Sequence, residues 1–152
     1  MQSIRGFTLF ELIVVVIIIA IISVMAVPAF ANILLKQNLN KSTRDLVIVL
    51  EKARSKAALE RRTVTVTLNS SSADTDSTLN WAASGKAALV STTTSIVFRS
   101  DGMVQDPITT TDLTLVLCDQ TQAQAQYSKR IILSHIGIVQ QRDLVTGNCN
   151  AN

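Results

Sequence analysis

Glu11 is the residue in this 152-residue chain whose chemistry most needs an explanation. It is the single acidic residue in an apolar stretch that follows Gly6 and continues to Leu35. A carboxylate at membrane depth costs about 2.5–3.5 kcal/mol on insertion scales, so one without a role is rarely retained. We therefore treat Glu11 as a candidate functional residue.

The segment from Leu12 to Ala31 supplies about the 20 apolar residues that a helix needs to span a bilayer. Its β-branched side chains are poor helix formers in water, but in lipid a helix satisfies its own backbone hydrogen bonds. Pro28 lacks an amide hydrogen, so we expect it to bend the helix near its outer end.

Two other interpretations of this segment are a cleaved secretory signal and a plain membrane anchor. The signal would use Arg5 as its positive region and Ala29-Phe30-Ala31 as its cleavage site. The length of the apolar run and the position of Glu11 at its start argue against a signal. A plain anchor leaves Gly6 and Glu11 unexplained.

Helical periodicity continues beyond the apolar segment, and we expect one helix from about Phe7 to Arg61. The residues of its apolar face recur at the spacings of an amphipathic helix. They are Leu39, Leu46, Leu50, Ala53 and Ala57.

Alternating, β-branched segments after the helix predict an antiparallel sheet, and the fold class is therefore α+β. Asp101-Gly102 predicts a turn, and Gly137 a bend or bulge. Strands are expected in residues 63–68, 79–83, 95–99, 113–118, 130–134 and 136–141.

The heptapeptide Gly6-Phe7-Thr8-Leu9-Phe10-Glu11-Leu12, together with the apolar run and Pro28, resembles the N-terminus of type IV pilins and secretion pseudopilins. The resemblance implies that a prepilin peptidase cleaves between Gly6 and Phe7 and methylates Phe7. It also implies that Glu11 pairs with the N-terminal amine of a neighbouring subunit during assembly, and that Pro28 belongs to the assembly helix.

The resemblance further implies a type IV pilin-like fold with four parts: a leader (1–6), a transmembrane and assembly helix (7–35), the amphipathic half of that helix (36–62) and a globular domain (63–152). The protein would cross the bacterial inner membrane once, with its C-terminal domain in the periplasm, and then enter a filament. Its partners would be other major and minor pilins or pseudopilins. The positive-inside rule does not support this orientation, because Lys36, Lys41 and Arg44 follow the apolar run.

Two segments, Phe98-Arg99-Ser100-Asp101-Gly102 and Ile131 to Ser134 with Gly137, resemble the branch that holds the H-type pseudopilins and the FimT/FimU minor pilins. This narrower resemblance predicts a minor pilin that initiates pilus assembly or forms the tip. The alternatives are a minor pseudopilin of a type II secretion system and a DNA-binding minor pilin in natural transformation.

The distribution of charge disfavours DNA as a partner. The net charge of +3 arises in residues 36–62, with eight Lys/Arg against three Asp/Glu, whereas residues 63–152 hold five against seven. DNA-binding members of the branch carry a Gly-Arg-x-Arg pattern, and Gly137-Ile138-Val139-Gln140 lacks both arginines. Candidate phosphate contacts remain at Lys129, Arg130 and Arg142.

Cys118 and Cys149 could form one disulfide in an oxidising periplasm, which would close about 32 residues and stabilise the fold by roughly 3–4 kcal/mol. Two unpaired thiols are the alternative. Two isolated cysteines and one histidine lack the spacing of a metal site.

Catalysis has little support in the sequence. His135 lies between two apolar runs, where a structural histidine is more common than a base, and its neighbour Ser134 should point to the opposite face. We find no phosphate loop, zinc-protease helix or nucleophile elbow. We therefore expect neither enzymatic activity nor a cofactor, a metal or a small-molecule substrate.

Overall fold

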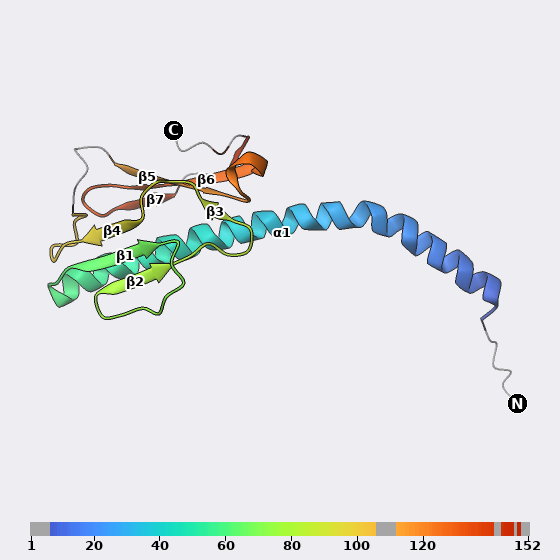
Figure 1. Cartoon of the computed structure of the whole chain (residues 1–152), viewed down its shortest axis with the longest axis horizontal. Helices are drawn as coiled ribbons and strands as arrows, with labels where there is room; N and C mark the ends of the chain where they lie inside the picture. The colour runs from blue at the N-terminus through green and yellow to red at the C-terminus, as the bar shows by residue number, and fades with distance from the viewer. Residues whose placement is uncertain (1–6, 106–111, 142–143, 148, 150–152) are drawn as a thin grey trace, which may run out of the picture. The chain divides into compact units, whose positions relative to one another are not determined.

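The structure is a computed structural model that describes residues 7–105, 112–141, 144–147 and 149 (Figure 1). The chain divides into two compact units, Met1–Leu34 and Leu35–Asn152. The leader with Gly6 lies outside the described residues, as does Arg142.

Helix α1 (Leu9–Glu60) runs through both units. Among the described residues, no single helix satisfies the length and composition expected of a membrane span, but two segments separated by a bend, Leu9–Val24 and Ala29–Glu60, satisfy them together. Pro28 lies between these segments. Its side chain lies outside the described part of the structure, so its role in the bend stays a prediction.

In the second unit, α1 buries the apolar face that the periodicity predicts. Leu39, Leu46, Leu50, Ala53 and Ala57 are all completely inaccessible to solvent. This burial confirms the predicted face, because a shift of one residue would turn a different set of side chains toward the sheets.

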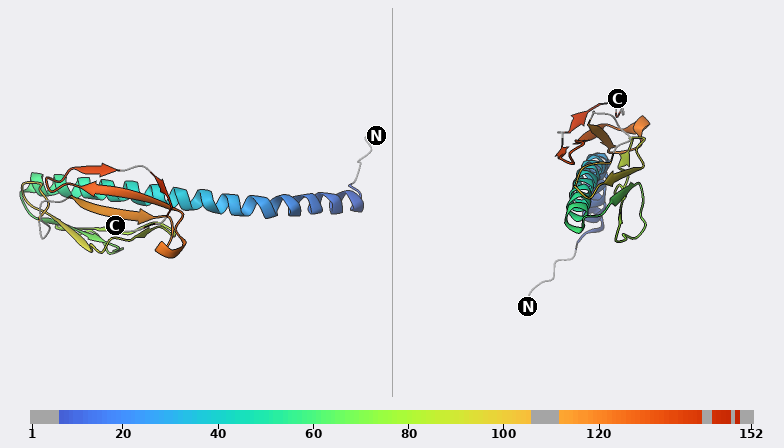
Figure 2. Two further views of the ribbon diagram at one scale, coloured as in Figure 1. Left: turned by 90° about the horizontal axis from the view of Figure 1, so that it is seen from above. Right: turned by 90° about the vertical axis from the view of Figure 1, so that its left-hand side faces the viewer.

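Two sheets pack around this face of the helix (Figure 2, right). The first has strand order β2-β1-β4, formed by Thr78–Trp81, Val64–Leu68 and Ser95–Phe98. The second has order β3-β5-β6-β7, formed by Ala88–Leu89, Leu113–Cys118, Tyr127–Leu133 and Val139–Gln141, and β8 (Val145–Thr146) also pairs with β6. The predicted α+β class with a long helix on sheets is confirmed.

One strand pairing differs from the predicted antiparallel sheet, because β1 and β2 run parallel. A parallel neighbour requires the chain to return along the whole length of the first strand. The nine residues 69–77 are long enough for this return, since extended chain covers about 3.3 Å per residue. Asp74 holds the loop in place by accepting a 2.8 Å hydrogen bond from the Asn80 amide.

The core is continuous between helix and sheets. Alternate residues of each long strand face α1, which is why Val64, Val66 and Leu68 of β1 are buried while Thr65 and Thr67 are not. The same face of the other strands supplies Leu79, Trp81, Ile96, Phe98, Leu115, Leu117, Ile131 and Leu133.

Several element boundaries differ from the predicted ones. β6 begins at Tyr127, earlier than residue 130, because Tyr127 pairs with Thr146 of β8 and Ser128 pairs with both β5 and β8. β7 begins at Val139 because Ser134 to Gly137 form a turn, in which the Gly137 amide donates to the Ser134 carbonyl. Short β3, β8 and the 3-10 helix η1 (Gln122–Gln124) were not predicted.

Two glycine turns meet the helix at Arg54. Gly102 and Gly137 have φ of +77° and +80°, a region that favours glycine. A Cβ on Gly137 would lie 2.5 Å from the Gly102 carbonyl oxygen and 2.9 Å from Arg54 Nε, whereas a Cβ on Gly102 would meet nothing closer than 3.6 Å. The turn at Gly137 therefore tolerates no side chain, for steric as well as conformational reasons.

The two turns provide a matched pair of substitutions. Gly102→Ala should cost about 1–2 kcal/mol of unfolding free energy from the left-handed backbone alone. Gly137→Ala should cost about 1–3 kcal/mol more, because the methyl group displaces a backbone carbonyl. Urea unfolding followed by the fluorescence of Trp81, the single tryptophan, measures both. Equal losses would contradict the close approach.

Candidate functional site

Glu11 lies in the first turn of α1, and its backbone amide contacts the residue that caps the helix. Its amide donates a 3.2 Å hydrogen bond to Thr8 Oγ1, so Thr8 caps the helix. The spacing Ser/Thr-x-x-Glu is the signature of a capping box, and this signal was available in the sequence. The Glu11 carboxylate itself makes no hydrogen bond or ion pair with any described residue.

The surroundings of Glu11 are apolar and uncovered. Every described side chain of α1 from Leu9 to Leu34 is exposed, with Phe10 at 75% and Ile13 at 48%. Monomeric soluble proteins rarely expose contiguous apolar patches of this extent. This segment therefore needs a cover of lipid or protein, and the carboxylate needs a partner that its own chain does not provide among the described residues.

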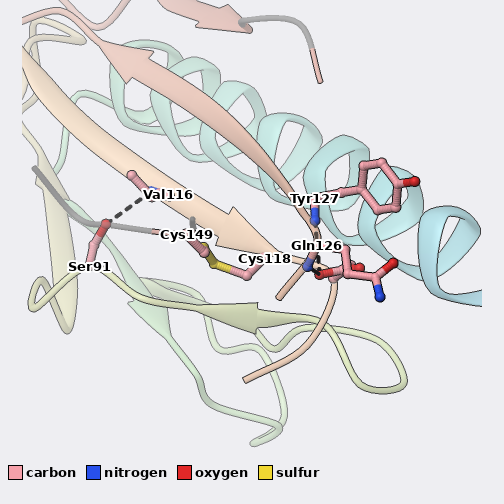
Figure 3. Close-up of a disulfide and its surroundings, with 7 residues drawn as sticks. Ser91, Val116, Cys118, Gln126, Tyr127 and Cys149 are labelled. Carbon is pink, nitrogen blue, oxygen red and sulfur yellow. Dashed lines mark hydrogen bonds between the residues drawn. A yellow bond between two sulfur atoms is a disulfide. The ribbon is translucent and has the colours of Figure 1, made fainter. Parts of the chain in front are cut away.

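A disulfide joins Cys118 to Cys149 (Figure 3). Both cysteines are buried, and with Val116 they form a small cluster separate from the main core. This cluster lies on the face of β5 turned away from α1, because residues 116 and 118 alternate with the helix-facing Leu115 and Leu117. The disulfide thus fixes Cys149 against the outer face of the second sheet.

Asp119 is a structural residue that the sequence analysis did not single out. It is fully buried at the end of β5, and its Oδ1 accepts hydrogen bonds from the amides of Gln126 (3.0 Å) and Tyr127 (3.3 Å). Oδ2 is buried and has no hydrogen-bond partner. The sequence does contain a signal for this role, because an aspartate directly after a predicted buried strand is typical of a turn residue.

The candidate DNA contacts do not form one cluster among the described residues. Lys129 is paired with Leu117 and shares the helix-facing side of β6 with Ile131. Arg130 is paired with Val116 and points to the other face, as neighbouring strand residues must. DNA contact by these residues stays a prediction, without a shared cationic face to support it.

The structure places His135 differently from the prediction. His135 is an exposed turn residue, where we had expected a structural histidine between strands. Its backbone carbonyl accepts the amide of Val104, so the residue's described role is to join two turns. Within the described ranges no group of three His, Cys, Asp or Glu could hold a metal ion.

Residues 42–137 match the family described as type II transport protein GspH, which is more than half of the chain. The chain belongs to the GspH family. Residues 1–27 of this GspH-family protein match the prokaryotic N-terminal methylation motif. No curated protein matches its sequence.

The GspH-family protein is also similar to a solved structure, the type IV minor pilin FimU of Pseudomonas aeruginosa. The TM-score is 0.50 and the identity 16%, and the similarity covers 71% of this chain and 90% of that one. This similarity confirms the type IV pilin-like fold.

These findings assign the protein to a class of filament subunits. The GspH-family protein is a minor pilin or pseudopilin of a type IV pilus or a type II secretion system. Proteins of this superfamily are structural subunits that assemble with other pilins and are processed through the methylation motif.

Reduction of the disulfide should lower the unfolding free energy of the GspH-family protein by about 3–4 kcal/mol, because the closed loop spans 31 residues of sequence separation. Urea titrations with and without dithiothreitol measure the change. The double variant Cys118→Ser, Cys149→Ser is the control, in which dithiothreitol should have no effect. An unchanged midpoint in the unmodified protein would show that the bond does not stabilise the fold.

Proposed function

We propose that this protein is a minor pilin of a type IV pilus that initiates assembly of the filament or forms its tip. It is cleaved between Gly6 and Phe7, methylated on Phe7, and held in the bacterial inner membrane by α1 with the second unit in the periplasm. It acts as a structural subunit and not as an enzyme.

The observation that carries the proposal is the uncovered apolar helix with one unpartnered carboxylate near its start. Lipid covers the apolar side chains before assembly, and the helices of neighbouring subunits cover them afterwards. Transfer from lipid to filament gains little hydrophobic free energy, since both surroundings are apolar. A charge pair between Glu11 and a neighbour's N-terminal amine would therefore provide direction and register to the assembly.

The second candidate is a minor pseudopilin of a type II secretion system, which the GspH family match favours. Both machines use a subunit with a methylated N-terminus and a pilin fold. They differ in the product of assembly, a surface pilus or a short periplasmic filament. Deletion of the gene separates them, because it should reduce the number of pili per cell in the first case and the export of secreted proteins in the second.

Glu11→Gln should leave leader cleavage unchanged and reduce the recovery of the protein in sheared filaments at least about tenfold, equivalent to about 1.4 kcal/mol per incorporated subunit. The substitution keeps the size of the side chain and removes only its charge. Mass spectrometry of the N-terminal peptide measures cleavage and methylation, and immunoblotting of sheared filaments measures incorporation.

Glu51→Gln is the control, because Glu51 is an exposed acid of the same helix within the second unit. It should leave both measurements unchanged. Normal incorporation of Glu11→Gln would remove the assembly role from Glu11. A mature chain that begins at Asn32 would instead identify the apolar segment as a secretory signal and overturn the proposal.

A further inference from the structure

Four cations surround the part of α1 that directly follows the apolar run. Lys36 comes one residue after Leu35, and Lys41 and Arg44 follow within the next turns. Since each residue turns a helix by about 100°, these three side chains leave the helix in different directions. Lys86 joins them from the loop before β3, because the neighbouring Gly85 lies against Asn38 of the helix. We call Lys36, Lys41, Arg44 and Lys86 the cationic collar.

The loops around the collar are tied to this part of the helix. The Ser84 amide donates a 2.8 Å hydrogen bond to Ser42 Oγ of α1. Lys36 Nζ lies 4.2 Å from the centre of the Tyr127 ring, a cation–π distance. The collar is therefore held as one surface at the end of the second unit that contains Leu35 and Lys36.

The collar cations have no acidic partners among the described residues. Three salt bridges join described residues, namely Lys52 with Asp74, Arg62 with Glu60, and Arg99 with Asp101, and none of them includes a collar residue. The segments 35–44, 82–90 and 119–130 contain one carboxylate, that of Asp119, which is buried. Asp45, directly after Arg44, is half-buried.

We infer that the cationic collar docks on the anionic headgroups of the bilayer before the subunit enters a filament. The inference rests on the proposed membrane-anchored function and adds to it a lipid class. An apolar run that ends one residue before Lys36 places the collar at headgroup depth, and lysine near an anionic surface is favoured about fivefold per charge. Tyr127 adds the amphipathic aromatic ring that is enriched at this depth.

Docking also explains the charges that the positive-inside rule leaves unexplained. Cations beyond the outer end of a span oppose its orientation during insertion. After insertion, the same cations hold the second unit against the membrane surface, with the loops 82–87 and 119–126 nearest the lipid. The collar must then leave the headgroups when the subunit passes from the membrane into the filament.

The test uses the full chain in nanodiscs of phosphatidylcholine, with and without phosphatidylglycerol. Hydrogen–deuterium exchange of the amides of Gly85 and Lys86 and of the 119–126 loop should slow at least about fivefold when phosphatidylglycerol is present. Added salt should remove most of this protection, since the attraction is screened.

The collar variant Lys41→Gln, Arg44→Gln, Lys86→Gln should lose the protection. It changes three exposed side chains and leaves Lys36 on Tyr127. The control variant Lys52→Gln, Lys56→Gln, Arg61→Gln also removes two lysines and one arginine, but at the other end of α1 and directly after it, so it should keep the protection.

Each other outcome overturns the inference in a recognisable way. Equal amide exchange with and without phosphatidylglycerol would show that the collar has no preference for anionic lipid. Equal loss of protection in the collar and control variants would show that the effect comes from net charge and not from the collar. Protection by duplex DNA in phosphatidylcholine discs, without protection by phosphatidylglycerol, would assign the collar to nucleic acid. A chain that does not enter either disc would overturn the proposed membrane function together with the inference.

Discussion

The rest of the structure depends on one constraint, which is that a single helix carries two different burial patterns. Up to Leu34 the described side chains of α1 are exposed all round, and from Leu39 onward one face is completely buried. An all-apolar surface suits lipid or the inside of a filament, whereas a one-sided apolar face suits a sheet and water. The change between the two patterns determines where the globular unit can begin.

The globular unit is closed at both ends by contacts other than the apolar core. At the end of α1, the backbones of two glycine turns approach each other against Arg54. At the opposite end of the second sheet, the disulfide holds Cys149 against β5, and the buried Asp119 holds the β5–β6 connection. These contacts allow short strands to form a stable unit, because each restricts a loop that apolar burial alone would leave mobile.

The distribution of charge follows the same division of the molecule. The described ion pairs lie away from the start of the second unit, and the cations near Leu35 form no salt bridge with a described residue. Charges without partners cost little at a wet surface and become useful where the surroundings supply the opposite sign. Glu11 is also a charge without a described partner, but it lies in apolar surroundings, where an unpaired charge costs far more free energy.

The long helix, its buried face, most strands and the pilin-like class could be predicted from the sequence, because helical and strand periodicities are local and the N-terminal motif is specific. The capping role of Thr8 and the turn role of Asp119 could also have been predicted from sequence patterns. The parallel pairing of β1 with β2 and the approach of Gly137 to Gly102 are properties of the folded chain alone. Each depends on where a distant segment of chain lies, and no local propensity encodes that position.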